Sequence, residues 1–199
     1  MSKRIVTISR QFGSGGHTVG KMVAEKLGVP CYDSELVTKI AEKSGFDVSF
    51  IQENGERTSR GTGLFYDMGL HGGTGFTTLS LYDQLYIAQH NIIRELAEKE
   101  ECVIIGRCAD YVLEDRDDCF HVLIYADDEF RAKRVLEQYG ESDMKIEKRL
   151  KKKDNQRESY YRHYTNREWG DHKNYHICLN TASISLEDCA AIITDLVRK

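Results

Sequence analysis

The stretch that decides the fold class is ISRQFGSGGHTVGKMVAEKLG, residues 8–28. It runs from an apolar strand through a glycine-rich turn into a helix, which is the layout of a phosphate-binding loop. Glycines allow positive φ and close approach of an anion, and a helix start adds partial positive charge. We therefore expect phosphate binding here, the alternative being a strand–helix turn without a ligand. The loop residues concerned are Gly13, Ser14, Gly15, Gly16, His17 and Thr18.

The loop lacks the lysine that such loops normally carry, because Gly15, Gly16 and His17 stand at that point. Loss of one charge-assisted hydrogen bond costs about 1.5–3 kcal/mol, and each 1.36 kcal/mol in the transition state is about tenfold in rate. Another cation must therefore substitute for efficient phosphoryl transfer. Arg10, at the mouth of the loop, is the first candidate, since a guanidinium can grip phosphate with two hydrogen bonds; a solvated side chain is the alternative. His17 is a weaker replacement, because the helix dipole disfavours its protonation.

Apolar runs alternate with helical patterns along the rest of the chain, which predicts an α/β fold. The strand-like runs are 4–9, 102–106, 120–126 and 175–180, with a weaker one at 29–33. The helical patterns are 18–28, 81–100 and 185–199, the last of which opens on a capping box of Ser185 and Asp188. Such β-branched runs suit a parallel sheet that is covered on both faces. We expect one domain over residues 1–199, with about five parallel strands flanked by helices.

Two segments depart from this alternation. Residues 54–78 are rich in glycine and threonine, and a loop of that length is usually functional or mobile. Residues 127–172 are highly charged and are expected to form helices away from the core. The overlapping stretch 157–176 interleaves basic and aromatic side chains, a pattern that also occurs in single-stranded nucleic-acid binding. Its acidic residues and the helical spacing of its aromatic residues favour packing on the core or on a lid instead.

The composition excludes several classes of protein. With 40% apolar residues, 30% charged residues and a formal charge of −4, we expect a globular protein that binds neither a membrane nor, mainly, nucleic acid. No apolar run approaches the roughly 18 residues of a membrane span. The start, MSKRIVTISRQ, has no apolar signal segment, so we expect a cytoplasmic location. The six cysteines form no C-x-x-C pair and are expected to be buried thiols, and the scattered histidines predict no zinc site.

The opening stretch resembles that of cytidylate kinases, whose loop follows the pattern G-x-x-x-x-G-K-G-T. Aligned on this pattern, Arg10 falls at the first glycine and Gly16 replaces the lysine. The version that reads S-R-x-[FY]-G-S-G-G resembles the divergent cytidylate kinase-like proteins more closely. In outline the resemblance covers nearly the whole chain and implies a three-layer P-loop kinase-type fold. The loop residues that match are Gly13, Ser14, Gly15 and Thr18.

Four further segments carry the resemblance, at 31–39, 104–113, 125–134 and 151–157. Segment 31–39 keeps a D-[ST] pair but has a lysine in place of an arginine. Segment 104–113 keeps the G-R of a D-G-R-D motif without its aspartates. Segment 151–157 keeps the D-x-x-R motif. Segment 125–134 resembles the start of a helical lid, placed at 127–165, in which Arg131 and Arg134 would clamp the phosphates. The segment 54–78 would be an insert near the acceptor. The implied acceptor-binding residues are Asp33, Ser34, Lys39, Arg107, Asp154 and Arg157.

Three of these residues are cations that follow strands or lie on the helices after them. Because open α/β sheets bind ligands at the carboxyl ends of their strands, we expect Lys39, Arg107 and Arg157 to converge on one phosphate, with separate surface salt bridges as the alternative. The resemblance has Asp154 reading cytosine, although Asp154 and Arg157 also form an ordinary i,i+3 helical pair. Without the D-G-R-D aspartates, Asp33 is the nearest acid that could help to position magnesium.

The residues and the resemblance together predict an ATP-dependent phosphotransferase. It would transfer the γ-phosphoryl group of ATP, bound with Mg²⁺, to a nucleoside monophosphate such as CMP. One alternative is a nucleotide-binding or regulatory protein whose catalysis is impaired by loss of the lysine. Another is a kinase of a different small acceptor, which the unusual 54–78 segment keeps open.

Overall fold

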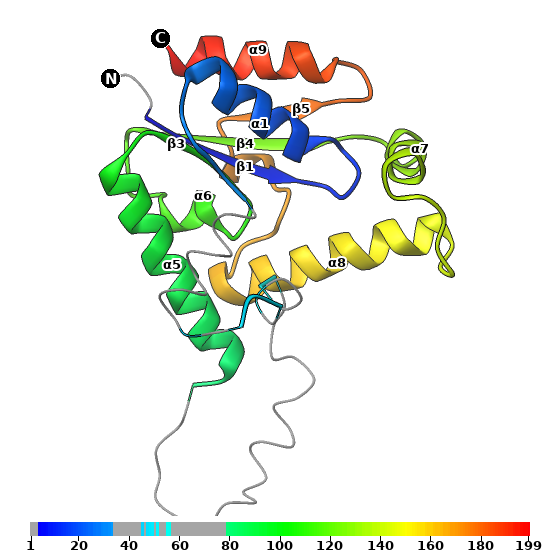
Figure 1. Ribbon diagram of the computed structural model, residues 1–199, viewed down its shortest axis with the longest axis horizontal. Helices are drawn as coiled ribbons and strands as arrows, with labels where there is room; N and C mark the ends of the chain where they lie inside the picture. Colours follow the sequence, from blue (N-terminus) through cyan, green and yellow to red (C-terminus); the bar gives the residue numbers. More distant parts are fainter. Residues whose placement is uncertain (1–3, 34–44, 46, 50, 52–54, 57–78) are drawn as a thin grey trace, which may run out of the picture.

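The computed structural model describes residues 4–33, 45, 47–49, 51, 55–56 and 79–199. Within these residues, five strands form one parallel sheet in the order β2-β3-β1-β4-β5 (Figure 1). The α/β class and the parallel sheet are therefore as predicted, although the weak strand at 29–33 shortens to two residues. The strands are β1 (Ile5–Arg10), β2 (Cys31–Tyr32), β3 (Cys102–Ile105), β4 (Cys119–Tyr125) and β5 (Ile177–Asn180).

Helices cover both faces of this sheet, as the apolar runs require. On one face, α1 (Gly16–Leu27) and α9 (Leu186–Val197) pack on Val6 and Ile8 of β1. On the other, α5 (Leu81–Lys99) and α6 (Ala109–Val112) pack on Ile5. Neighbouring residues of one strand thus enter different cores because strand side chains alternate. Figure 1 shows the two layers of helices above and below the sheet.

The charged region after β4 forms two helices, α7 (Asp128–Tyr139) and α8 (Ile146–Thr165), followed by the short η1 (His172–Asn174). The expectation that these helices lie away from the core is only partly met. Val135 of α7 is fully buried, and a Cβ at Gly13 would lie 2.8 Å from its side chain. Tyr160 and Tyr161 of α8 join an apolar cluster with Cys108, so the aromatic stretch packs as predicted. A few apolar residues at helical spacing are enough to anchor an otherwise charged helix.

Two smaller predictions also concern the fold. Ser185 caps α9, since its hydroxyl accepts a hydrogen bond from the amide of Asp188 at 3.0 Å. Four of the six cysteines are buried, namely Cys102, Cys108, Cys119 and Cys189. In the described part of the chain, every helix is too short or too polar to cross a bilayer.

Candidate functional site

The glycine loop connects β1 to α1. Two of its glycines combine a left-handed backbone with a lack of room for a side chain. Gly13 and Gly15 have φ values of 83° and 82°, in the left-handed region. A Cβ would lie 2.8 Å from the carbonyl oxygen of Arg131 at Gly13 and 2.7 Å from Leu186 at Gly15. No side chain caps the start of α1, and the amides of a helix's first turn have no intrahelical partner. The loop therefore has the backbone of an anion cradle.

Two hydroxyl groups of the loop have different surroundings. Ser14 is fully buried, and its hydroxyl donates to the carbonyl oxygens of Gln11 at 2.9 Å and Ile124 at 3.1 Å. The Ser14 side chain thus ties the loop to β4. The Thr18 hydroxyl instead accepts a hydrogen bond from Nη2 of Arg134 at 3.0 Å, which brings one predicted lid arginine to the start of α1.

Arg10 occupies the space that a side chain at position 16 would need. A Cβ built on Gly16 would lie 2.4 Å from Cβ of Arg10 and 3.2 Å from its Cγ. Real Cβ atoms do not come this close to another carbon, so the two positions cannot both carry a side chain in this arrangement. The Arg10 stem therefore lies where the stem of the missing lysine would begin.

The other predicted lid arginine, Arg131, lies behind the loop with Asp154. Arg131 is 5% exposed and pairs with Asp154 and Asp128. Its Nη1 donates to the carbonyl oxygen of Phe12 at 3.1 Å, while Asp154 accepts from the Phe12 amide at 2.8 Å. Burial opposes the charge of Arg131, but the two carboxylates outweigh it and raise the pKa. In this structure, Arg131 and Asp154 hold the loop from α7 and α8.

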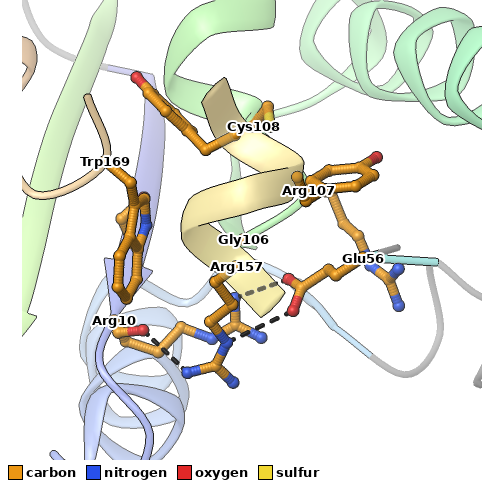
Figure 2. A pocket seen from close by; sticks show the side chains of 10 residues that line it. Arg10, Glu56, Gly106, Arg107, Cys108, Arg157 and Trp169 are labelled. Atoms are coloured by element: carbon orange, nitrogen blue, oxygen red, sulfur yellow. Dashed lines mark hydrogen bonds and ion pairs between the residues drawn. The ribbon is translucent and has the colours of Figure 1, made fainter. Parts of the chain in front are cut away.

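A pocket opens beside the loop, at the carboxyl ends of β1 and β3 (Figure 2). Arg10 comes from β1, Arg107 from the turn after β3 and Arg157 from α8, so three guanidinium groups from distant segments line it. Nη1 of Arg10 contacts a Glu56 oxygen at 3.0 Å, and Nε of Arg157 contacts the other at 3.4 Å. Arg157 also donates to the carbonyl oxygen of Arg10 at 2.9 Å. Arg107 and Arg157, two of the three cations predicted to converge, therefore line one pocket, and Arg10 lines it with them.

The turn that carries Arg107 has an unusual backbone. Gly106, Arg107 and Cys108 have φ values of 73°, 58° and 55°, three left-handed residues in succession. A non-glycine residue in such a conformation costs of order 1–3 kcal/mol, and such strain clusters at functional sites. A Cβ at Gly106 would lie 2.0 Å from Nη1 of Arg10 and 2.8 Å from Oε1 of Glu56. The glycine thus lets the Arg10–Glu56 pair lie directly against the backbone.

The charges in the pocket are strongly coupled. Burial alone would raise the pKa of Glu56, but Arg10, Arg157 and Arg107 outweigh it and hold that pKa far below its usual range. Burial and the neighbouring Arg10 lower the pKa of Arg157 to about 10, although Glu56 acts in the opposite direction. Burial also disfavours the charge of Arg10, yet Glu56 and Asp33 raise its pKa. One carboxylate therefore faces three arginines.

The remaining predicted residues lie at the border of the site or outside the described residues. Asp33 follows β2 and contacts Nε2 of His17 at 3.0 Å. Burial would raise its pKa, but the His17 hydrogen bond and the charge of Arg10 outweigh this and lower it. Ser34, Lys39 and most of the predicted insert at 54–78 lie outside the described residues. No cluster of three or more His, Cys, Asp or Glu side chains suited to a metal occurs among the residues that are described.

Sequence reasoning missed Glu56. It is a single acid in a segment without helical or strand periodicity, and its partners lie 46 and 101 residues away. The available signal was charge balance, since three cations predicted to converge on one phosphate, Lys39, Arg107 and Arg157, leave an excess of positive charge that calls for an acid in the free protein.

A second acid, Asp110, lies beside the pocket. It is 4% exposed, and its carboxyl group accepts hydrogen bonds from Tyr161 at 2.7 Å and Ser9 at 3.5 Å. Burial raises the pKa of Asp110 to about 6, against the opposing effect of these hydrogen bonds. Because Ser9 and Tyr161 both line the pocket, Asp110 fixes two of its hydroxyl groups.

Replacing Asp110 by asparagine should change the pH dependence of stability. The unfolded chain releases the Asp110 proton near the usual pKa of 3.8, whereas the folded protein keeps it up to about 6. The folded state therefore binds more protons in this window, and the free energy of unfolding falls as pH rises through it. At about 1.4 kcal/mol per pKa unit, Asp110 should account for a loss of about 3 kcal/mol.

Urea unfolding between about pH 4 and pH 7 measures this loss as the difference between wild type and variant. Asp110→Asn should abolish the loss, whereas Asp115→Asn should retain it, because Asp115 is an exposed acid paired with Arg94. An Asp110→Asn profile parallel to that of the wild type would contradict this account of the buried acid.

Comparisons with known protein sequences identify the family of this chain. The pattern of the cytidylate kinase-like family matches residues 5–183. The chain is 27% identical over 196 residues to a cytidylate kinase from Archaeoglobus fulgidus, covering 96% of this chain and 93% of that protein.

Solved structures share the fold of this chain. An uncharacterized protein from Eubacterium ventriosum is similar with a TM-score of 0.71 and 27% identity, covering 98% of both chains. A shikimate kinase from Bacteroides thetaiotaomicron has a TM-score of 0.59 at 15% identity, covering 98% of both chains, and shares the fold. Since the family pattern runs from the start of β1 to the loop after β5, this chain belongs to the cytidylate kinase-like family.

Proposed function

We propose that this protein is a cytoplasmic ATP-dependent phosphotransferase. The triphosphate of ATP would bind the glycine loop, and an anionic acceptor would bind the pocket lined by Arg10, Arg107 and Arg157. The observation that carries the proposal is the position of Arg10, whose stem fills the space above Gly16. This position supports a role for Arg10 as the cation that replaces the missing lysine.

Arg10 would act between the donor and the acceptor. Its Cβ lies against Gly16 of the glycine loop, and its Nη1 lies against Gly106 of the pocket. Phosphoryl transfer depends on positioning and on neutralising the charge that spreads over the transferred group. A guanidinium that spans the two binding regions is placed to do both, with Arg107 and Arg157 fixing the acceptor.

Arg134 would contribute from the donor side. It bonds to Thr18 at the start of α1, and its Nε lies 3.3 Å from a Cβ built on Gly15. This position suits contact with the triphosphate on the loop. Arg131 would have an indirect role, since it holds the backbone of Phe12 through which the loop joins β1.

Magnesium would enter with ATP. Mg²⁺ binds oxygen ligands and usually keeps several waters, needing one or two protein groups besides the phosphates. Thr18 and Asp33 offer such oxygens at the start of α1, where Asp33 contacts His17. The ion supplies charge that draws the phosphates together, while the chain positions them.

A second candidate is a kinase of an acceptor other than CMP. Asp154, which the family resemblance has reading cytosine, is bonded to the Phe12 amide and to Arg131. Each oxygen of the carboxylate thus already accepts a hydrogen bond from the protein, and the Asp154 side chain is only 16% exposed, which favours a role in holding the loop over one in reading a base. An acceptor recognised through its anionic group, rather than through a cytosine, fits this arrangement.

A coupled assay with ATP and Mg²⁺ tests both candidates. We expect turnover with at least one acceptor from a panel of nucleoside monophosphates and small anionic alcohols, and preference for CMP would favour the first. Absence of turnover with all of them at high enzyme concentration would remove the proposal. A nucleotide-dependent rise in thermal stability without turnover would instead favour a binding or regulatory protein.

A further inference from the structure

The Glu56 carboxylate occupies the part of the pocket where an anionic acceptor group would bind. One of its oxygens pairs with Arg10 and the other with Arg157 (Figure 2). The oxygen that pairs with Arg10 also lies close to the backbone of Gly106. The side chains of Arg10, Arg157 and Glu56 are 16–18% exposed, so the three groups satisfy one another largely out of water. An acceptor phosphate needs the same guanidinium groups, and the two anions cannot use them together.

A single carboxylate is a poor complement to this pocket. It offers two oxygens and one negative charge, whereas two arginines pair with it and the charge of a third, Arg107, also acts on it. Nη1 of Arg107 is buried and has no hydrogen-bond partner among the described residues. Buried donors of this kind normally find an acceptor. A tetrahedral dianion offers more oxygens and a second charge, and so matches the arginines better than Glu56 does.

We propose that Glu56 is a specificity-determining residue, which holds the arginines together in the free protein and yields its place only to a dianionic acceptor. This inference rests on the proposed function for the identity of the site. A monoanion would exchange one negative charge for another and gain little from displacing Glu56. A dianion such as a phosphate monoester would gain the attraction of its second charge to the three guanidinium groups of the pocket.

Binding of simple anions to the full-length protein tests this directly. The probes are sulfate and methyl sulfate, which share a tetrahedral shape but carry two negative charges and one, respectively. Titration calorimetry at constant ionic strength would compare wild type with Glu56→Gln. We expect Glu56→Gln to bind sulfate about tenfold tighter and to bind methyl sulfate with a larger gain, so that discrimination by charge decreases.

Two controls make the result specific to the pocket. Glu114→Gln also removes a carboxylate that pairs with an arginine, Arg167, and should leave both affinities unchanged within about twofold. Because sulfate can also bind the glycine loop, the gain must disappear in the double variant Glu56→Gln/Arg157→Gln. A gain that persists there would place the effect outside the pocket and overturn the proposal.

A third variant covers the case in which Glu56→Gln fails to fold. Glu56→Asp keeps the charge but withdraws the carboxylate by one methylene from contacts of 3.0 and 3.4 Å, and it should also bind sulfate more tightly. Equal or weaker binding by the folded variants would overturn the proposal, because Glu56 would then help to bind the anion. All these titrations omit nucleotides. The titrations therefore test the role of Glu56 in anion binding even if the coupled assay shows no phosphoryl transfer.

Discussion

An Arg10→Gly/Gly16→Lys double variant should regain phosphoryl transfer that each single variant loses. The two side chains compete for one space, since Cβ atoms at positions 10 and 16 would lie 2.4 Å apart. Arg10→Gly removes the cation and should lower kcat/KM by about one to three powers of ten. Gly16→Lys alone forces the new stem into Arg10 and should impair both activity and stability.

Like the wild type, the double variant has one cation and one glycine at these two positions. The cation is now at position 16 and the glycine at position 10. We expect its kcat/KM for ATP to return to within about tenfold of wild type, which is a strong positive coupling between the sites. The measurement is the coupled assay together with thermal unfolding of all four proteins.

Arg4→Gly is the matched control for the loss of an arginine near the other end of β1. Arg4 is 41% exposed and pairs with Glu101, so its removal should leave kcat/KM unchanged. A double variant that is less active than both single variants would show that the two cations do not occupy equivalent positions. Full activity of Arg10→Gly would remove Arg10 from the mechanism altogether.

The fold could be predicted because its determinants are local. Strand runs such as 102–106 are apolar without interruption, and burial on both faces of a parallel sheet demands that pattern. The glycine loop was likewise readable, since two of its glycines satisfy backbone needs that no other residue meets. Arg10 could be proposed from the sequence as well, because it is a cation at the mouth of a loop that lacks its usual lysine.

The rest of the site depends on contacts that no local pattern encodes. Asp154 accepts from the amide of Phe12 across 142 residues, so its engagement could not be inferred from the D-x-x-R spacing alone. Glu56 meets Arg157 across 101 residues, and nothing in its own segment distinguishes it from a solvated acid. Periodicity locates elements, whereas the pairing of side chains at the ends of those elements needs their positions in space.

Gly106→Ala should weaken acceptor binding while the glycine loop still binds ATP. The new Cβ would lie 2.0 Å from Nη1 of Arg10 and 2.8 Å from Oε1 of Glu56. The Arg10 guanidinium would have to move away from Gly106, and Glu56, the partner it shares with Arg157, would shift with it. We expect the affinity for the acceptor or for sulfate to fall at least about tenfold, which corresponds to roughly one lost charge-assisted hydrogen bond.

An alanine at position 106 would both strain the backbone and collide with Arg10. The same substitution at Gly28 is a control that introduces the backbone strain alone. Gly28 has the same φ of 73°, but a Cβ there would meet nothing within 4 Å. Gly28→Ala and Gly106→Ala should therefore share a loss of about 1–2 kcal/mol in the free energy of unfolding. Only Gly106→Ala should also weaken anion binding. If the two variants bound sulfate equally well, the contact between Gly106 and Arg10 would be incidental, and the strained turn would serve only to connect β3 to α6.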